Sequence, residues 1–255
     1  MSFKGRVYII TGGGSGMGLA TAKILVQQGA RVGLVGRTAA TLERAVEELG
    51  ADNAMALAAD VANLTAISDA FKAIKNRFGR LDGVVNNAGI ARPNPIEELD
   101  EDEVQLQVQT NFVGTVFCCQ AAIPLLRGSD NPRIVNVSSA SAWHTDEMLQ
   151  LSIYASTKAA VERFTRDLRV ELQEDGIGVT CLRPGSADTG FAESWDFARL
   201  KRSVDKWHDL GPKMDVGMTA EHVAESIVHV LGYPSGVAVD LLEIRPNQAV
   251  EKIKF

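Results

Sequence analysis

Cysteine is scarce in this chain, with three residues in 255, and two of them stand side by side as Cys118 and Cys119. An odd number of cysteines without paired spacing argues against a disulfide framework. The neighbouring pair is more typical of a buried core than of a redox centre. The four histidines form no tight cluster with the cysteines at the spacing of a zinc site, so we predict that the protein holds no metal.

Long apolar runs and an excess of basic residues are also missing. No apolar stretch approaches the roughly 20 residues of a membrane-spanning helix, and the N-terminal residues lack the apolar region and cleavage site of a signal peptide. The 26 Lys and Arg against 32 Asp and Glu give a net charge of -6, which disfavours nucleic acid as a partner. We therefore expect a cytoplasmic protein that binds neither membranes nor nucleic acid.

No Pro, Gly and Ser linker and no repeat divides the chain, so we predict one domain over residues 1–255. Short apolar runs alternate with amphipathic stretches, which is typical of βαβ units and a parallel sheet. We predict an α/β fold, a doubly wound Rossmann-type domain of about seven strands with helices on both faces. The expected strands cover 7–10, 31–35, 54–58, 81–85, 133–137, 178–182 and 237–244. The expected helices cover 17–28, 39–49, 64–78, 102–126, 154–172 and 220–231.

Two stretches, about 140–153 and 189–216, interrupt this alternation and contain all three tryptophans. Ligands bind beyond the carboxyl ends of the strands in such sheets, so we predict that both stretches are substrate loops. Their large apolar side chains suit either a mid-sized, partly apolar ligand or a lid packed on the body of the protein. These side chains are Trp143, Met148, Leu149, Phe191, Trp195 and Trp207.

A glycine-rich turn stands between the first predicted strand and the first predicted helix. Backbone N–H groups at a helix N-terminus bind a pyrophosphate, and side chains in the turn would hold the phosphates away. We expect Gly12 to permit the tight turn, Gly16 the close approach and Gly18 the packing of helix on strand. The flanking strand and helix favour a dinucleotide site over a flexible loop. The predicted contacts here are Gly12, Gly14, Ser15, Gly16, Met17 and Gly18.

The end of the second predicted strand bears on the kind of dinucleotide. Folds that bind NAD place an acidic residue about 20 residues beyond the glycines, where it holds the ribose 2′-hydroxyl. This chain has Arg37 there and no acid, and a guanidinium forms charge-assisted hydrogen bonds with a 2′-phosphate. The sequence thus favours NADP(H), with NAD(H) as the other cofactor to consider and a surface arginine without a ligand as the alternative for Arg37.

From Lys4 to about Asn247 the chain resembles the short-chain dehydrogenases/reductases. The resemblance rests on the order and spacing of several short motifs. They are Asp60-Val61, Asn86-Asn87-Ala88-Gly89, Asn111 with Gly114, Ser138-Ser139, Tyr154 with Lys158, and Pro184-Gly185 with Thr189. It implies an oxidoreductase that transfers a hydride reversibly between NAD(P) and a carbonyl or secondary alcohol.

The resemblance also implies cofactor contacts after successive strands. It places Asp60 near the adenine amino group and Val61 beside the ring; by itself, Asp60 is equally typical of a helix cap or turn. After the fourth strand, the resemblance implies contacts on the adenosine side from Asn87, Ala88 and Gly89. After the sixth strand, it implies contacts with the nicotinamide carboxamide from Pro184, Gly185 and Thr189.

Tyr154 and Lys158 are four residues apart, which places them on one face of a helix. A phenol titrates near 10, and a neighbouring ammonium favours the phenolate, so we expect Lys158 to lower the pKa of Tyr154. The resemblance implies that Tyr154 exchanges a proton with the substrate oxygen and that Lys158 holds the nicotinamide ribose. For the pair in isolation, an interfacial tyrosine and a solvated lysine are the alternative.

Ser139 and Asn111 are predicted to act with this pair. Ser139 ends a strand, and its hydroxyl can donate to a carbonyl oxygen that becomes negative. Ser141 fits the family's spacing to the tyrosine better, but residues 135–139 match the family's strand end and loops accept insertions. Asn111 stands in a predicted helix, where asparagine is a poor helix former. The resemblance implies that Asn111 holds a water in a proton relay to Lys158, and a buried, hydrogen-bonded asparagine is the alternative.

The substrate is expected to be a small carbonyl or alcohol. No basic cluster in the two loops indicates an acyl carrier or coenzyme A, and residues 241–248 resemble the end of NADP-dependent hydroxy-acid and carbonyl reductases. The family is commonly tetrameric, so we expect a homodimer or homotetramer. The alternatives are an NAD-linked alcohol dehydrogenase that works in the oxidation direction and a non-catalytic dinucleotide sensor, which would not need Ser139, Tyr154 and Lys158 together.

Overall fold

The computed structural model describes residues 3–145, 148–192 and 195–252, and a parallel sheet runs through its centre. The strands of this sheet, in chain order, are β1 (Val7–Thr11), β2 (Arg31–Gly36), β3 (Ala54–Ala58), β4 (Gly83–Asn86), β5 (Arg133–Val137), β6 (Gly178–Pro184) and β10 (Leu241–Ile244). Their spatial order is β10-β6-β5-β4-β1-β2-β3, and every neighbouring pair is parallel. The order reverses between β1 and β4, which is the switch point where open α/β sheets bind ligands.

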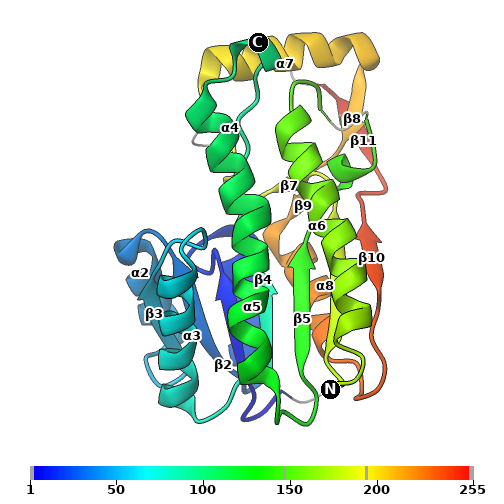
Figure 1. Cartoon of the computed structure of the whole chain (residues 1–255). Coiled ribbons are helices and arrows are strands. Elements are labelled where there is room, and N and C mark those ends of the chain that lie inside the picture. Colours follow the sequence, from blue (N-terminus) through cyan, green and yellow to red (C-terminus); the bar gives the residue numbers. More distant parts are fainter. Residues whose placement is uncertain (1–2, 146–147, 193–194, 253–255) are drawn as a thin grey trace.

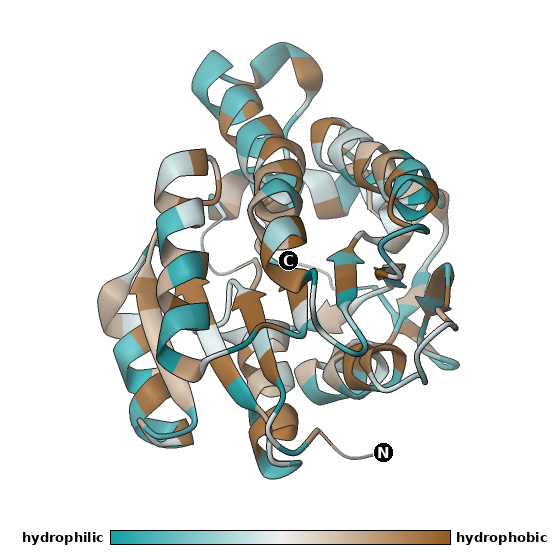
Figure 2. Cartoon of the chain, turned by 60° about the horizontal axis from the view of Figure 1, so that its bottom comes forward, coloured by the Kyte–Doolittle hydropathy of each residue, from teal (hydrophilic) through white to brown (hydrophobic). Residues whose placement is uncertain are grey.

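Helices cover both faces of the sheet, as predicted (Figure 1). One face packs against α1 (Gly16–Gln27), α2 (Ala39–Leu49) and α8 (Ala220–Leu231), and the other against α3 (Leu64–Phe78), α5 (Gly114–Leu126) and α6 (Ser152–Glu171). The residues of β1 are all buried and alternate between the two layers, with Tyr8 and Ile10 in one and Val7 and Ile9 in the other. A parallel sheet covered on both faces requires such continuous apolar strands, and Figure 2 shows them as brown arrows between the helices. The predicted seven-stranded Rossmann-type fold is confirmed.

The long helix predicted over 102–126 is interrupted. It consists of α4 (Glu101–Val108), a π-helical segment, η2 (Gln109–Val113), and α5. Such π segments are rare and occur frequently at functional sites, and this one contains Asn111. The last predicted strand is also shorter, because the N–H of Val237 closes a turn onto the carbonyl of Pro234 before β10 begins.

The prediction that 189–216 is a loop is wrong, because this stretch contains α7 (Phe197–Trp207). Asp196 caps this helix by accepting a hydrogen bond from the backbone N–H of Arg199 at 2.9 Å. Apolar residues recur at positions 197, 200, 204 and 207, so both a cap and a helical period were present in the sequence. We call the described residues of this stretch, 189–192 and 195–216, the lid.

Short elements connect the lid to the rest of the chain. Two-stranded pairings join β11 (Ala249–Glu251) to β8 (Lys213–Asp215) and β7 (Ala187–Asp188) to β9 (Met218–Thr219). The short helical turns are η1 (Ile96–Glu98), η3 (Ala140–Ala142) and η4 (His208–Leu210). In Figure 1, α7 and α4 lie above the carboxyl ends of the strands. Within the described ranges, no helix combines the length and apolar character needed to cross a membrane.

Candidate active site

A cavity of about 560 Å³ lies where β1, β4, β5 and β6 end, and lid residues form part of its wall. Segments far apart in the sequence meet there: the glycine turn, the turn after β4, the end of β5, the start of α6 and the segment after β6. The predicted site residues in its wall are Gly12, Ser15, Gly16, Met17, Asn87, Ala88, Gly89, Ser139, Tyr154, Lys158, Pro184, Gly185 and Thr189. Six predicted residues lie outside the wall: Gly14, Gly18, Arg37, Asp60, Val61 and Asn111.

The glycine turn is held against the turn that follows β4. Gly12 and Gly16 have positive φ angles of 65° and 49°, which glycine adopts without strain. A Cβ on Gly18 would lie 2.3 Å from the carbonyl oxygen of Gly12, so the predicted close packing is present. Asn87 ties the two turns together, because its Nδ2 donates to the carbonyl of Thr11 at 3.0 Å and its N–H donates to Thr11 Oγ1 at 3.0 Å.

The start of α1 suits an anionic ligand. The helix begins at Gly16, and no acidic residue occupies its first turn. Ser15, the N-cap residue, makes no side-chain capping hydrogen bond within the described structure. Because Ser15, Gly16 and Met17 all line the cavity, the positive end of the helix dipole lies at the cavity wall, where a pyrophosphate would fit.

Arg37 is exposed just beyond the end of β2, next to the glycine turn, since the N–H of Gly12 donates to the carbonyl of Val35 at 2.8 Å. No hydrogen bond or ion pair joins its guanidinium to another described residue. Thr38 follows as the N-cap of α2, and its hydroxyl makes no capping bond in the part of the chain that is described. Sequence reasoning missed Thr38, although a threonine before a helical pattern is the usual sign of an N-cap.

Three of the predicted residues outside the cavity wall have packing or turn roles. The Asp60 carboxylate accepts a hydrogen bond from the N–H of Ala62 at 2.9 Å, as in a turn. Val61 is buried, and a Cβ on Gly114 would lie 2.5 Å from its Cγ2. Gly14 packs against α2, where a Cβ would lie 3.0 Å from Thr41 Cγ2.

Asn111 is fully buried, and its side chain fastens three segments together. Its Oδ1 accepts from the N–H of Ile90 at 2.8 Å, and its Nδ2 donates to the carbonyl of Ile90 at 2.8 Å and to Thr157 Oγ1 at 3.0 Å. The π-helical segment, the chain after β4 and α6 therefore meet at this amide. A Cβ on Gly89 would lie 3.3 Å from Lys158 Nζ and 3.4 Å from Asn111 Oδ1, so both groups lie against the same glycine.

Tyr154 and Lys158 lie on one face of α6, with Lys158 Nζ 5.9 Å from the centre of the tyrosine ring. Lys158 is buried, and its Nζ donates to the carbonyl of Val137 at 2.8 Å. Burial lowers the pKa of Lys158 to about 8. Burial likewise raises the pKa of Tyr154 above its ordinary 10, opposed by a hydrogen bond with Ser139. The prediction that Lys158 lowers the pKa of Tyr154 is wrong for the protein without its cofactor, because burial removes water from the phenol and disfavours its charged form.

The three serines that follow β5 have different partners. Ser139 lies beside Tyr154 in the cavity wall, where its hydroxyl opposes the rise in the pKa of the phenol. Its Oγ lies 2.9 Å from Ser141 Oγ, and Ser141 lines the cavity beside it. The hydroxyl of Ser138 turns instead to Glu162, donating to Oε1 at 2.9 Å. The structure therefore puts Ser139 next to the tyrosine and Ser141 in support of Ser139.

A buried ionic network lies behind these serines, and sequence reasoning missed it. Arg183 Nε donates to Glu162 Oε1 at 2.8 Å, and its Nη1 donates to Glu243 Oε2 at 2.6 Å. Glu243 Oε1 in turn lies 2.7 Å from His144 Nε2. The network connects α6, β6 and β10 to the loop after Ser139. Its members are widely separated in the sequence, so no local pattern indicated that they meet.

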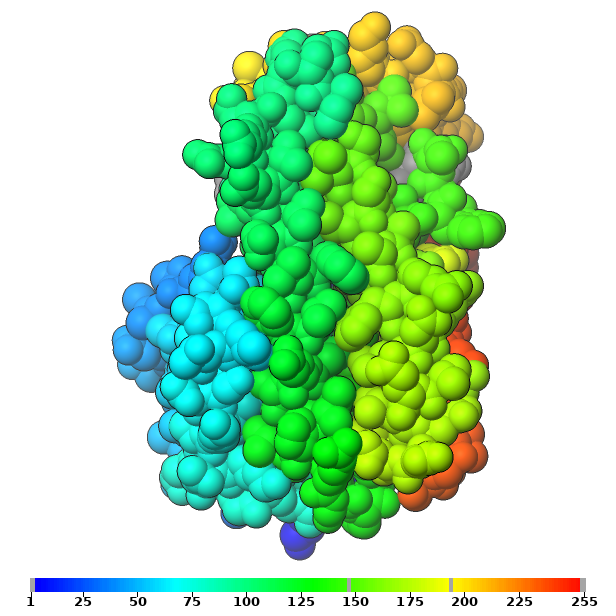
Figure 3. Space-filling model, in the orientation of Figure 1, coloured from blue at the N-terminus to red at the C-terminus, as the bar shows by residue number. Residues whose placement is uncertain are grey.

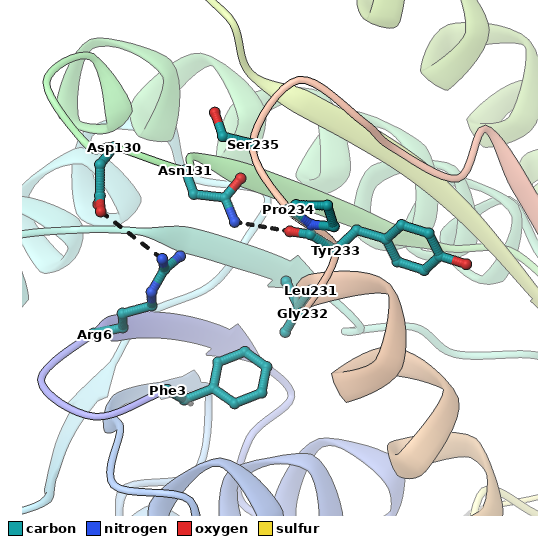
Figure 4. Close-up of a pocket in the computed structure, with 9 residues that line it drawn as sticks. All are labelled: Phe3, Arg6, Asp130, Asn131, Leu231, Gly232, Tyr233, Pro234 and Ser235. Carbon is teal, nitrogen blue, oxygen red and sulfur yellow. Dashed lines mark hydrogen bonds and ion pairs between the residues drawn. The ribbon is translucent and has the colours of Figure 1, made fainter. Parts of the chain in front are cut away.

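A second hollow of about 300 Å³ lies at the opposite end of the sheet (Figure 4). An ion pair of 3.9 Å between Arg6 and Asp130 crosses it, and Asn131 Nδ2 donates to the carbonyl of Tyr233 at 2.9 Å. Among the described lining residues of this hollow, none belongs to a predicted site. Ligands of open parallel sheets bind at the carboxyl ends of the strands, so the larger cavity is the candidate active site.

Comparison with known proteins agrees with this geometry. A family model described as short chain dehydrogenase matches residues 6–199. An uncharacterised oxidoreductase of Staphylococcus epidermidis is 33% identical over 243 residues, covering 95% of this chain and 98% of that protein. The chain therefore belongs to the short-chain dehydrogenase family and is an oxidoreductase of that type.

Solved structures share the whole fold. Levodione reductase is 30% identical with a TM-score of 0.82, covering 95% of this chain and 97% of that one. The 3-ketoacyl-(acyl-carrier-protein) reductase from Brucella melitensis, complexed with NADH, is 30% identical with a TM-score of 0.83, covering 95% and 98%. The closed form of a serine dehydrogenase complexed with NADP+ is 27% identical with a TM-score of 0.82, covering 94% of each chain.

Proposed function

We propose that the protein is a nicotinamide-dependent reductase that prefers NADP(H) and transfers a hydride reversibly between the cofactor and a carbonyl or secondary alcohol. The observation that carries the proposal is that Ser139, Tyr154 and the buried Lys158 line one cavity, which extends to the start of α1. Similar structures hold NADP+ in one case and NADH in another, which supports a nicotinamide cofactor. The catalytic unit is the single domain of residues 1–255, with 140–153 and the lid as its substrate segments.

The bound cofactor would supply the hydride chemistry, and the chain binds and orients it. The start of α1 would hold the pyrophosphate, and Lys158 would hold the nicotinamide ribose. The turn after β4 would line the adenosine side, with Asp60 and Val61 at the adenine. The segment after β6 would meet the carboxamide through Pro184, Gly185 and Thr189, all of which line the cavity.

Ser139 and Tyr154 act on the substrate oxygen. In reduction, the Ser139 hydroxyl donates to the carbonyl oxygen while negative charge develops there. Tyr154 gives its proton to the same oxygen, and its raised pKa keeps the phenol protonated at neutral pH. Lys158, with Asn111 against the same glycine, replenishes that proton from solvent.

The cofactor assignment depends on Arg37 and predicts that removing its side chain weakens the use of NADPH but not of NADH. Wild-type protein should oxidise NADPH with at least one member of a panel of ketones and aldehydes, and with a lower KM for NADPH than for NADH. Arg37→Ala should raise the KM for NADPH by about tenfold or more and leave the KM for NADH unchanged, because it removes a charge-assisted hydrogen bond to the 2′-phosphate. Absorbance of the reduced nicotinamide at saturating carbonyl measures both constants.

Arg44→Ala is the matched control, since Arg44 is an exposed arginine on α2, seven residues beyond Arg37. It should change neither KM. Equal losses for both cofactors in Arg37→Ala would contradict the 2′-phosphate role, and no turnover with any carbonyl would remove the proposed function.

The raised pKa of Tyr154 predicts opposite pH profiles for the two directions. Alcohol oxidation needs the phenolate, which is scarce at neutral pH, so its kcat/KM should rise from about pH 7 to about pH 10, approaching tenfold per pH unit. Carbonyl reduction needs the phenol and should not rise over this range. Initial rates in a buffer of constant ionic strength give both profiles, and a flat oxidation profile would show that Tyr154 is not the group that titrates.

We also propose that the protein is cytoplasmic and forms a homodimer or homotetramer. Side chains of α5 and α6 form one continuous face in Figure 3, and Val170 of α6 is 60% exposed on the chain by itself. The proposal rests on this paired-helix face, against which a second copy of the chain would pack. Light scattering, which measures the molar mass in solution, distinguishes a dimer from a tetramer of the 27.4 kDa chain.

A further inference from the structure

Few charged groups line the candidate active site. Among the described lining residues, only Lys158 and Asp188 carry a charge. Lys158 Nζ is bonded to Val137, and in the proposed function it is committed to the cofactor ribose. The Asp188 carboxylate is exposed and has no hydrogen bond or ion pair with another described residue. An anionic substrate would therefore meet an unpaired carboxylate and no free cation.

The segments around the cavity also lack basic residues in their sequence. Residues 140–153 and 185–198 contain no arginine or lysine. The nearest arginines further along the chain, on α7, are directed elsewhere: Arg199 pairs with Glu103 at 2.7 Å and Arg202 with Glu98 at 2.9 Å. His144, the one histidine of the first segment, is bonded to Glu243.

The rest of the lid side of the wall is apolar and aromatic. The ring of Phe191 packs on that of Tyr154 with centroids 5.7 Å apart, and Trp195 packs on Phe191 at 5.9 Å. The other large apolar side chains on this side are Met148, Leu151, Trp207 and Met214. An apolar ring-sized group placed here would be close to the tyrosine that acts on the carbonyl.

Lys252 holds one of these walls in place from the other end of the chain. It is buried after β11, its Nζ donates to the carbonyl of Trp207 at 2.6 Å, and it lies 4.7 Å from the centre of the Trp207 ring. The lysine ammonium is thus engaged by Trp207, and Lys252 is not among the described residues that line the cavity. Trp207 is fixed by backbone and ring contacts, and its place in the cavity wall does not depend on a ligand.

We infer that the substrate is an uncharged ketone or secondary alcohol that carries an apolar, ring-sized group, and that Trp207 and Met214 select for it. The inference rests on the proposed function and specifies its substrate class. Substrates that would place a carboxylate or phosphate against the lid side of the cavity are rejected, because burying an anion at this apolar wall without a cation is strongly unfavourable. An apolar group of the substrate binds favourably because its surface is removed from water against the lid.

A matched pair of ketones tests this inference: methyl 4-acetylbenzoate, which is neutral, and 4-acetylbenzoate, which has the same frame with a carboxylate. With NADPH, kcat/KM for the ester should exceed that for the carboxylate by at least about tenfold. Met214→Lys places a cation in the wall and should lower this ratio by about tenfold or more, while Met214→Leu, the apolar control, should leave it unchanged.

Tryptophan fluorescence of the NADP+ complex gives a second measurement that does not need turnover, since Trp195 and Trp207 line the cavity. The ester should bind more tightly than the carboxylate. Equal or tighter binding of the carboxylate, or binding of neither compound, would overturn the inference even if another carbonyl is reduced. Failure of the proposed function looks different, because then NADPH is not oxidised with any carbonyl.

Discussion

Tyr154→Phe should lower kcat for carbonyl reduction by about 10²–10⁴-fold, the usual contribution of a positioned proton donor. Tyr154 lines the cavity with Ser139, so removing one oxygen takes away the proton donor without changing the shape of the wall. The dissociation constant for NADPH should stay within about twofold, because the proposed cofactor contacts are the glycine turn and Lys158. Single-turnover kinetics measures the chemical step, and fluorescence titration measures cofactor binding.

Tyr233→Phe is the matched control. It makes the same chemical change in the hollow at the opposite end of the sheet and should leave kcat unaffected. Turnover that survives Tyr154→Phe would show that another group supplies the proton. A wild-type protein that binds NADPH tightly and reduces no carbonyl would instead return the chain to the class of dinucleotide sensors.

Arg183→Met should destabilise the protein by about 3–5 kcal/mol, the range found when one member of a buried ion pair is removed. The side chains of Arg183 and Glu162 are only 6% and 10% exposed, so the variant leaves a buried carboxylate without its guanidinium. Urea unfolding followed by far-UV circular dichroism measures the free energy of unfolding. Loss of the link from Arg183 through Glu162 to Ser138 should also displace the neighbouring Ser139 and lower kcat in the folded fraction.

Two further variants separate a buried-charge effect from a general loss of packing. Adding Glu162→Leu to Arg183→Met removes the orphaned charge and should recover a large part of the lost stability. Arg163→Met breaks the exposed pair with Asp167, whose side chains are 77% and 53% exposed, and should cost no more than about 1 kcal/mol. If Arg183→Met were no more destabilising than Arg163→Met, the network would not support the fold.

Local patterns in the sequence were sufficient for most of the fold. The helices at 39–49, 64–78 and 220–231 and the strands at 54–58 and 133–137 have the bounds that were predicted. Each is decided by a hydrophobic period and by the residues at its ends, which are properties of a short window. The prediction missed the lid helix α7, although Asp196 and the apolar period of 197–207 indicated it, because the stretch was interpreted as a loop beyond the carboxyl end of a strand.

The order of short motifs identified the walls of the cavity in the same way. The glycine turn, Asn87, Ser139, Tyr154 and Lys158 meet there because the carboxyl ends of parallel strands share one edge of the sheet. The direction of the Tyr154 pKa shift could not be obtained this way. It depends on how completely the folded chain removes water from the phenol, and spacing along a helix contains no such information.

The sequence by itself determined the α/β fold, the family and the residues that gather at the ends of the strands, since these follow from periodicity and from motif order. Tertiary structure alone decided the long-range contacts. Asn111 bonds to Ile90 and Thr157, Arg183 bonds to Glu162 and Glu243, and Lys252 bonds to Trp207. The physical reason is separation along the chain. These contacts join residues 21 to 60 positions apart, and only the packed chain brings their charges and amides within hydrogen-bonding distance.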